Sequence, residues 1–561
     1  MSRGSFVRRR DAGAVTPLAP DTRPLLASGV TFEPAAGDDA WIAMIHGVPS
    51  SRVSAAVVDL LSAMDGDTAL RDLHRRFAAS DSFEIFVHLV HRFRASGLLD
   101  GDARLPPGRV AYRPPFTLQL ATLRAPALFR RLDRLIVPLS ARAVRVSVGV
   151  VLGLGLLAAV PQASDMLTVL ATPVPLPGLL SLLAALSLLT LLHESAHGVT
   201  LTRFGGTPRR AGFMLFYLTP AFFVDVTDGW RLPDRRQRVA IALAGPVTHA
   251  AVGAVAVIAA FVLRQPIVHE ALLLLALSCG VIVLVNAIPF VRFDGYIALM
   301  SALDEPNLRA RAIRDGGDAL TRVLFGGPRR GKSLDRWWSV PFGLASLVAP
   351  VVLVLIAVDR TARALAGGGP VLGLLVLALD VAVVLVGIAL LVKALLRILR
   401  SGVPRLRFAA VVAALVVSAV IAGATVPVGA TATFGFIRHG DDVVLVSAGE
   451  TDAVEVPEGA PVVLLSNGIL LHAEVGEGTA SPQPPEPTRV PLDALVPVTA
   501  DGLSVPAVVV AAVDLADVRP GVPSTGRARL ELGTRSLWQT LWMTGVVSPL
   551  SLLQSEREKK E

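Results

Sequence analysis

Seven long apolar segments constrain the fold of this chain more than any other feature of its sequence. Each is long enough to approach or cross a hydrocarbon core about 30 Å thick, and they lie at about 143–160, 176–202, 239–263, 271–291, 341–358, 371–392 and 408–427. Charged residues make up only 17% of the 561 residues, whereas soluble domains carry about 25%. The composition excludes a soluble enzyme and a disordered chain. It predicts a polytopic α-helical membrane protein with about seven transmembrane helices.

Positive charges are distributed unevenly among the loops between these segments. Lys and Arg gather in three loops, 203–238, 301–340 and 393–407. The loops between them contain few or none. Because cytoplasmic loops carry an excess of Lys and Arg, we expect a multi-pass protein with a cytoplasmic N-terminus and an extracytoplasmic C-terminal domain. The excess of basic residues behind the net charge of +8 is then explained by the cytoplasmic loops. We therefore predict no nucleic-acid partner.

The two ends of the chain are more polar and predict separate domains. Residues 1–105 begin with a β-like stretch and continue with three helical patterns, at 52–64, 68–77 and 83–99, which favours a small α/β winged-helix-like module. Residues 428–545 contain short β-rich runs between turn residues, which indicates an all-β domain. The other parts are a linker and membrane-surface segment, a transmembrane region with its core, and a charged tail, at 106–142, 143–427 (core 176–300) and 546–561.

Two further apolar stretches are too short or too polar to be counted as spans. Residues 211–226 contain Pro220 and Asp225, and we interpret them as an inserted loop or hairpin packed against the helices. The 18 residues from Ser536 to Leu553 include two Trp and favour a segment at the membrane interface. The alternative for this second stretch is an eighth span.

The sharpest chemical signal is an HExxH motif, His193-Glu194-Ser195-Ala196-His197. Two His four residues apart lie on one face of a helix, so both imidazoles can bind one Zn²⁺ while Glu194 acts on its water. Residues 176–192 carry no charge, and polar groups there are costly unless they face an interior site. The plainer alternative is a polar helix end that faces the headgroups.

A catalytic zinc ion keeps one position open and therefore takes three protein ligands. Cys279 is the only cysteine, so the third ligand must be His, Asp or Glu. Asp294 is the strongest candidate because it follows the apolar segment 271–291, with Asn286 and Pro289 expected in the last turns of that helix. A simple Asp294-Gly295 turn is the alternative when this motif is taken by itself.

The motif pair resembles the site-2 protease family of intramembrane zinc metalloproteases. HExxH lies in a first core helix, and Asn286-x2-Pro289-x4-Asp294-Gly295 in a third. Ala244-Gly245-Pro246 in the middle helix matches a Gly-Pro element of the family. Residues from Pro220 to Arg238 and from Asp304 to Arg309 resemble the bacterial peptide zinc metalloprotease subgroup. The resemblance covers about residues 140–320. Phe293 stands before Asp294, where many members have another apolar residue, Leu.

The resemblance implies a fold, a site and a location. The fold would be a site-2-protease-like helical core in a bacterial cell membrane. His193, His197 and Asp294 would be the metal ligands of Zn²⁺, Glu194 the general base, and Asn286 a catalytic residue that steadies the substrate carbonyl or its oxyanion. Because members of the subgroup often occur with genes for ribosomally made, modified peptides, the substrate would be a precursor or leader peptide. The overall layout is similar to the intramembrane metalloproteases of daptide biosynthesis.

The outer domains carry weaker resemblances. The N-terminal module is similar to the PqqD-like elements that bind leader peptides on a sheet edge, and an unrelated helical domain is the alternative. The C-terminal domain resembles the barrel parts of HlyD-type secretion adaptors, which would give it an export transporter as partner. An unrelated β sandwich is the alternative there.

Together these patterns predict a zinc metalloendopeptidase that cuts a membrane-associated peptide in the bilayer. Two other functions are kept open. One is a non-hydrolytic scaffold or export accessory that passes a peptide across the membrane. The other is a regulatory protease that releases a membrane-bound transcription regulator, which the absence of a recognisable PDZ-like sequence does not favour.

Overall fold

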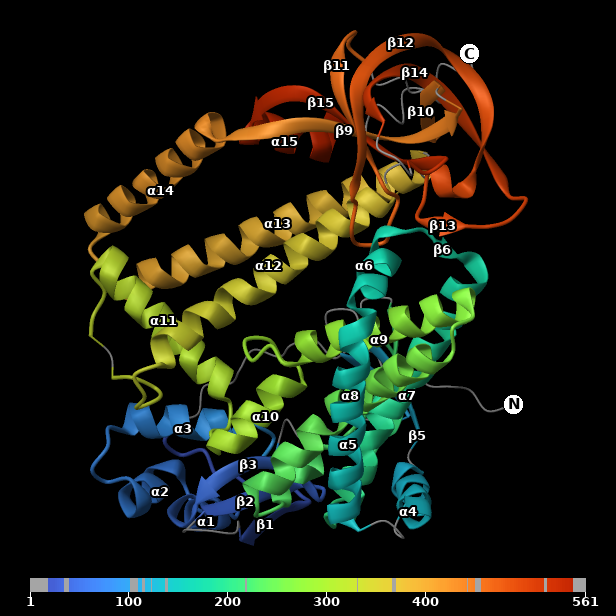
Figure 1. The fold of residues 1–561 in the computed structure, drawn as a ribbon. Helices are drawn as coiled ribbons and strands as arrows, with labels where there is room; N and C mark the ends of the chain where they lie inside the picture. Colours follow the sequence, from blue (N-terminus) through green and yellow to red (C-terminus); the bar gives the residue numbers. More distant parts are fainter. Residues whose placement is uncertain are drawn as a thin grey trace, which may run out of the picture. The chain divides into compact units, whose positions relative to one another are not determined.

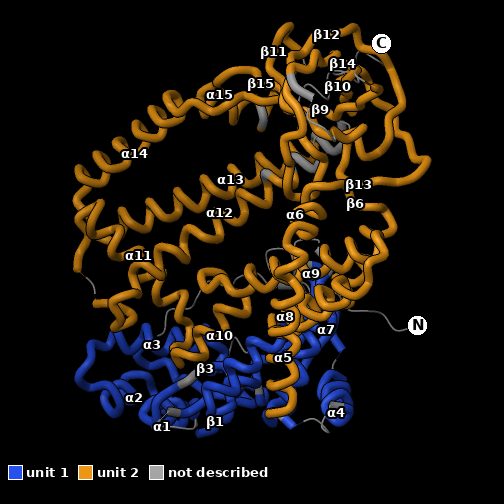
Figure 2. The backbone as a smooth tube through the Cα atoms, in the orientation of Figure 1, with its two compact units in different colours: residues 1–140, 190–245 blue, residues 141–189, 246–561 orange. Residues whose placement is uncertain are grey.

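The computed structural model describes residues 19–34, 40–100, 109–113, 117–122, 124–136, 140–216, 219–329, 331–365, 370–440, 442–448, 456–518 and 522–547 (Figure 1). The chain forms two compact units, coloured separately in Figure 2. The first contains residues 1–140 and 190–245, and the second contains residues 141–189 and 246–561. Each unit is described by itself.

The first unit begins with a small module of one sheet and three helices. The antiparallel sheet has the order β1-β2-β3 and is formed by β1 (Val30–Pro34), β2 (Ala40–Ile45) and β3 (Val48–Ser54). The helices are α1 (Ala55–Ser62), α2 (Leu70–Phe77) and α3 (Phe83–Ala95). Their apolar faces meet in a core that includes Leu61, Leu73 and Phe86. The three helical patterns of the sequence correspond to these helices, and the first one starts later because residues 52–54 complete β3.

A second sheet of the first unit differs from the sequence-based interpretation of residues 106–142. These residues contain β4 (Val110–Arg113) and β5 (Thr117–Thr122) before α4 (Ala125–Ile136), so the linker interpretation of their first part is wrong. The stretch 211–226 forms the hairpin of β7 (Ala211–Phe216) and β8 (Thr219–Val224). The sheet order is β4-β5-β7-β8. The pairing of β5 with β7 joins segments about 90 residues apart, which no local pattern reveals.

Among the described residues, seven helices are long and apolar enough to cross a membrane, and this number confirms the prediction. They cover residues 142–171, 176–203, 235–262, 266–286, 339–358, 374–400 and 405–425. The corresponding elements are α5 (Ala141–Ala159) with η1 (Val160–Gln162) and α6 (Ala163–Ala171), α7 (Leu176–Arg203), α8 (Arg235–Val262), α9 (Pro266–Asn286), α12 (Ser339–Leu365), α13 (Pro370–Arg400) and α14 (Arg405–Thr425). Large side chains such as Leu156, Leu284 and Leu385 are exposed on them, as a lipid-facing surface requires.

One helix end was predicted wrongly. Helix α9 stops at Asn286, so Pro289 lies beyond it and not in its last turns. A proline disfavours helical backbone in the residue before it, and the chain leaves the helix three residues ahead of Pro289. The next helices are α10 (Asp294–Leu303) and α11 (Leu308–Phe325), whose packing residues include Tyr296, Leu308 and Ala312.

The C-terminal β domain is confirmed and is a closed barrel. Its strand order is β10-β14-β12-β11-β15-β9, formed by β9 (Pro427–His439), β10 (Asp442–Ala448), β11 (Ala460–Leu465), β12 (Glu474–Pro491), β14 (Ser504–Val518) and β15 (Thr525–Ser536). Phe436, Leu445 and Leu464 are fully buried in its core. Each of the six strands pairs with two neighbours in this closed order.

Short elements complete the structure. They are β6 (Val174–Pro175), which pairs with β13 (Val498–Thr499), and η2 (Thr227–Arg231), η3 (Leu492–Ala494), α15 (Leu537–Trp542) and a π-helix, η4 (Met543–Val547). Trp538 of α15 donates from its indole N–H to the carbonyl of Val420 at 3.3 Å. Most of the predicted charged tail, from residue 548 onward, lies outside the described residues, so the eighth span remains a sequence-based alternative.

Candidate metal centre

Helix α7 places the HExxH motif at a buried position. His193 is 8% exposed and His197 is 6% exposed. Their Nε2 atoms lie 3.2 Å apart. Two nitrogen ligands of a tetrahedral zinc ion, each about 2.0–2.1 Å from the metal, are about 3.3 Å apart by the same geometry. The helix alone therefore presents two imidazoles at a separation that suits one zinc ion.

The hydrogen bond of His197 indicates which of its ring nitrogens carries a proton. Its Nδ1 lies 2.6 Å from the carbonyl oxygen of Ile241, in α8. A carbonyl oxygen only accepts hydrogen bonds, so Nδ1 must carry the proton. In the neutral ring Nε2 is then the unprotonated nitrogen, and it lies 3.2 Å from Nε2 of His193. This is the arrangement by which proteins orient a histidine ligand for a metal.

The backbone of α8 passes very close to both imidazoles. A Cβ atom placed on Gly245 would lie 2.4 Å from Nε2 of His193 and 2.5 Å from Nε2 of His197. Only glycine leaves room for the two rings at this point. The next residue, Pro246, lies inside α8 and has no N–H to donate to the carbonyl four residues back, that of Ala242.

Glu194 is held by the hairpin β7–β8. Its Oε2 accepts a hydrogen bond of 3.1 Å from the backbone N–H of Val224, the last residue of β8. The next N–H, that of Asp225, donates toward the other side, to the carbonyl of Arg210. Successive N–H groups of a strand point to opposite sides, so Val224 donates at the outer edge of the sheet. The carboxylate of Glu194 thus lies beside a strand edge.

Asp294 completes a group of possible ligands. It is the first residue of α10. The ligand atoms of His193, His197 and Asp294 all lie within 4.8 Å of one another. Two imidazole nitrogens and one carboxylate oxygen form a donor set used by catalytic zinc sites. The three predicted ligands are therefore brought together, and the donor set fits zinc.

Asn286 ends α9, and its Nδ2 donates to the carbonyl of Ile282 at 3.0 Å. This bond holds the amide against its own helix. The role of Asn286 in steadying a substrate carbonyl stays a prediction. Asp294 and Asn286 belong to one tight connection, because a Cβ on Gly295 would lie 2.6 Å from the carbonyl oxygen of Asn286.

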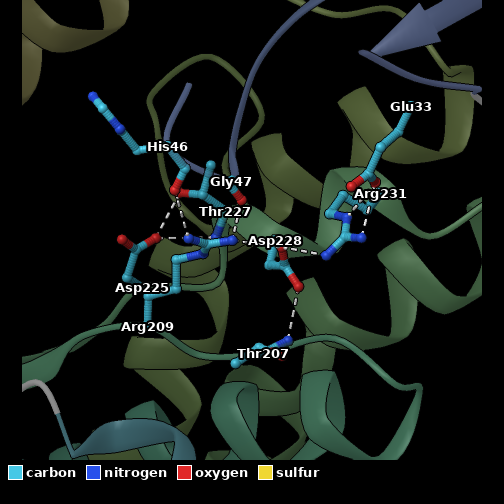
Figure 3. A network of polar contacts seen from close by, with 9 residues as sticks. All are labelled: Glu33, His46, Gly47, Thr207, Arg209, Asp225, Thr227, Asp228 and Arg231. Carbon is cyan, nitrogen blue, oxygen red and sulfur yellow. Dashed lines mark hydrogen bonds and ion pairs between the residues drawn. The ribbon is translucent and has the colours of Figure 1, made fainter. Parts of the chain in front are cut away.

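A buried carboxylate outside the predicted site organises the connection to the N-terminal module (Figure 3). Asp228 is 3% exposed and accepts from the backbone N–H of Thr207 at 2.8 Å. Its other oxygen lies 3.5 Å from Arg231 and 3.9 Å from Arg209. From the sequence, Asp228 could line a substrate path or, more plainly, form a turn with Gly229. Neither the charge of Asp228 nor its spacing from other residues in the sequence showed that it is buried and contacts two arginines.

Arg209 and Arg231 also contact residues of the N-terminal sheet. Arg231 forms an ion pair of 2.8 Å with Glu33 of β1. Arg209 donates to the carbonyls of His46 and Gly47, which form the turn between β2 and β3. Burial lowers the pKa of Arg231, but the Asp228 and Glu33 carboxylates outweigh it and leave the pKa above its ordinary value. The module is therefore joined to Arg209 by hydrogen bonds and to Arg231 of η2 by an ion pair.

Replacing Asp228 with asparagine should weaken this connection. The substitution keeps the shape but removes the charge that both arginines face, and loss of a charged hydrogen-bond partner costs about 1–3 kcal/mol. We expect the N-terminal module to become more sensitive to limited proteolysis and the first thermal transition to fall. Asp225→Asn is the matched control, because Asp225 bonds locally to Thr227. Equal behaviour of the two variants would contradict the role of Asp228.

The chain matches no protein-family model, no curated protein and no solved structure. The resemblance to the site-2 proteases that the sequence predicts therefore rests on the motif residues alone. Those residues are the HExxH motif of α7 and Asp294 at the start of α10, in the geometry given above.

Proposed function

We propose that this chain is a membrane-embedded zinc metallopeptidase of the site-2 protease type, which hydrolyses a peptide bond in a membrane-associated precursor peptide. The observation that carries the proposal is the geometry of the histidine pair. Two buried Nε2 atoms lie 3.2 Å apart, and the lone pair of one is set by the bond from Nδ1 of His197 to Ile241. The seven apolar helices support a site within a membrane.

Each residue of the site has a role that follows from its chemistry. His193, His197 and Asp294 would hold the metal, and zinc in such a site supplies Lewis acidity and a nucleophile at neutral pH. Glu194 takes the proton of the attacking water and returns it to the leaving amide nitrogen. The bond from Val224 keeps one carboxylate oxygen of Glu194 in place. Asn286 would steady the substrate carbonyl.

The substrate must be extended when it is cut, because the amides of a membrane helix are hydrogen-bonded within it. The outer edge of β8 offers a place for an extended peptide, since β8 ends the four-stranded sheet and Glu194 lies at that edge. Strand addition pairs a peptide's backbone with such an edge. The N-terminal module, joined to this hairpin through Asp228, would select a leader sequence, and the barrel would dock an export partner.

Metal content and cleavage test this proposal together. The full chain, purified in detergent, is analysed for bound metal and incubated with precursor peptides encoded near its gene. We expect one zinc ion per chain, loss of cleavage after chelation, and recovery when zinc is added back. Absence of zinc from a folded preparation that also fails to take it up would contradict the proposal and favour the non-hydrolytic scaffold.

A further inference from the structure

A cavity of about 360 Å³ lies in the first unit, and its lining residues do not include His193 or His197. One wall is α4, which contributes Arg130, Asp133 and Arg134. The other wall runs from the last turn of α7 at Thr202 into the turn formed by Gly205 and Gly206. The side chains of Arg130 and Arg134 are exposed, so their guanidinium groups are accessible. The lining carries two positive charges and one negative charge.

Helix α4 presents three different faces. Ala125 and Phe129 are buried against α7 and the hairpin. The face with Arg130, Asp133 and Arg134 lines the cavity. A third face exposes large apolar side chains seven residues apart: Leu128 is 46% exposed and Leu135 is 78% exposed. A short helix with such a face and several arginines is suited to lie in a membrane interface.

The position of the cavity along the chain places it at the depth of lipid headgroups. Thr202 is in the last turn of an apolar helix, residues 176–203, long enough to cross a membrane. Helix α4 ends at Ile136, and the next apolar helix begins at Arg142. Six residues span at most about 22 Å. In a membrane-spanning chain both walls are therefore near the bilayer surface.

We propose that this cavity binds the headgroup of phosphatidylethanolamine, a zwitterionic phospholipid with a phosphate and a primary ammonium. The guanidinium groups of Arg130 and Arg134 donate to the phosphate, for which arginine is well suited. The carboxylate of Asp133 accepts from the ammonium. A purely anionic headgroup would face Asp133 without a cation, and a choline headgroup has no N–H to donate. The acyl chains follow the exposed face of Leu128 and Leu135.

A bound lipid would also support the proposed metal centre. Phe129 of α4 packs directly on Gly198, where an added Cβ would lie 2.4 Å from the Phe129 ring. Gly198 follows His197 in α7. A headgroup that bridges α4 and the end of α7 would hold this contact in place. The proposal of a lipid site is supported by the cavity and by the charges that line it. It does not depend on whether the chain hydrolyses peptides.

The test measures lipid binding and not hydrolysis. The full chain is delipidated in detergent and titrated with phosphatidylethanolamine, phosphatidylglycerol or phosphatidylcholine, with retained lipid measured by native mass spectrometry and stability by thermal unfolding. We expect one retained phosphatidylethanolamine and the largest thermal stabilisation from this lipid. The double variant Arg130→Gln/Arg134→Gln should bind it roughly 10- to 100-fold more weakly, since two charged hydrogen-bond donors are lost.

Matched variants separate this site from general surface charge. Arg131→Gln removes an exposed arginine of the same helix that does not line the cavity, and we expect unchanged binding. Asp133→Asn should shift the preference toward phosphatidylglycerol. Equal stabilisation by all three lipids, or by inorganic phosphate, would overturn the proposal, and this comparison requires only the wild-type chain. A loss of binding in Arg131→Gln as large as in the double variant would overturn it as well.

Discussion

Replacing Glu194 with glutamine is expected to abolish peptide hydrolysis while one zinc ion per chain stays bound. Glutamine cannot take a proton from water, and removal of a general acid–base group costs about 10²- to 10⁴-fold in rate. The ligand atoms belong to other residues, so the metal should remain. The amide oxygen of glutamine can still accept from Val224, whose N–H holds the present carboxylate at 3.1 Å. The fold of α7 and β8 should therefore be kept.

The measurement pairs metal analysis with single-turnover cleavage of a precursor peptide. Glu84→Gln serves as the control, because Glu84 is exposed in the first turn of α3 and should cleave like the wild type. Undiminished cleavage by Glu194→Gln would sink the proposed role of Glu194. A scaffold that only binds and passes on a peptide predicts a different outcome, in which Glu194→Gln keeps full export function.

Local patterns were sufficient for the features that depend on neighbours in the sequence. The apolar length of a segment predicts a membrane helix whatever it packs against, and all seven were found. The i and i+4 spacing of His193 and His197 places both rings on one helix face in any fold. The end of α9 was placed too late because hydrophobicity continues to Val291, whereas Pro289 limits the helix by backbone sterics that a hydropathy pattern does not record.

Local sequence patterns could not predict the contacts between segments that are distant in the chain. Val224 is 30 residues from Glu194, and Ile241 is 44 residues from His197. Both contacts use backbone groups, which every residue carries, so no side-chain type marks them in the sequence. Asp228 was missed for a related reason. The residues next to Asp228 in the sequence predict a turn. Its burial results from tertiary contacts that involve Arg209, Arg231 and the N-terminal sheet, which a local pattern does not record.

Replacing Gly245 with alanine should separate the stability of the protein from its capacity to bind zinc. In a helix, alanine is favoured over glycine by about 1 kcal/mol, so propensity alone predicts a slightly more stable α8. The added methyl group, however, would lie 2.4 Å from Nε2 of His193 and 2.5 Å from Nε2 of His197. Neither ring can stay where it is, because both contacts are far shorter than van der Waals distance.

The metal should therefore be affected much more than the fold. Misplacement of ligands by a change in their supporting shell typically lowers metal affinity 10- to 100-fold, and we expect at least this loss in Gly245→Ala, with cleavage reduced in parallel. Competition with a zinc chelator measures the affinity, and far-ultraviolet circular dichroism shows whether the helices persist. Gly280→Ala is the matched control, because a Cβ there meets nothing within 4 Å. Wild-type zinc affinity in Gly245→Ala would mean that zinc is not held by the two Nε2 atoms, which would remove the observation on which the peptidase proposal rests.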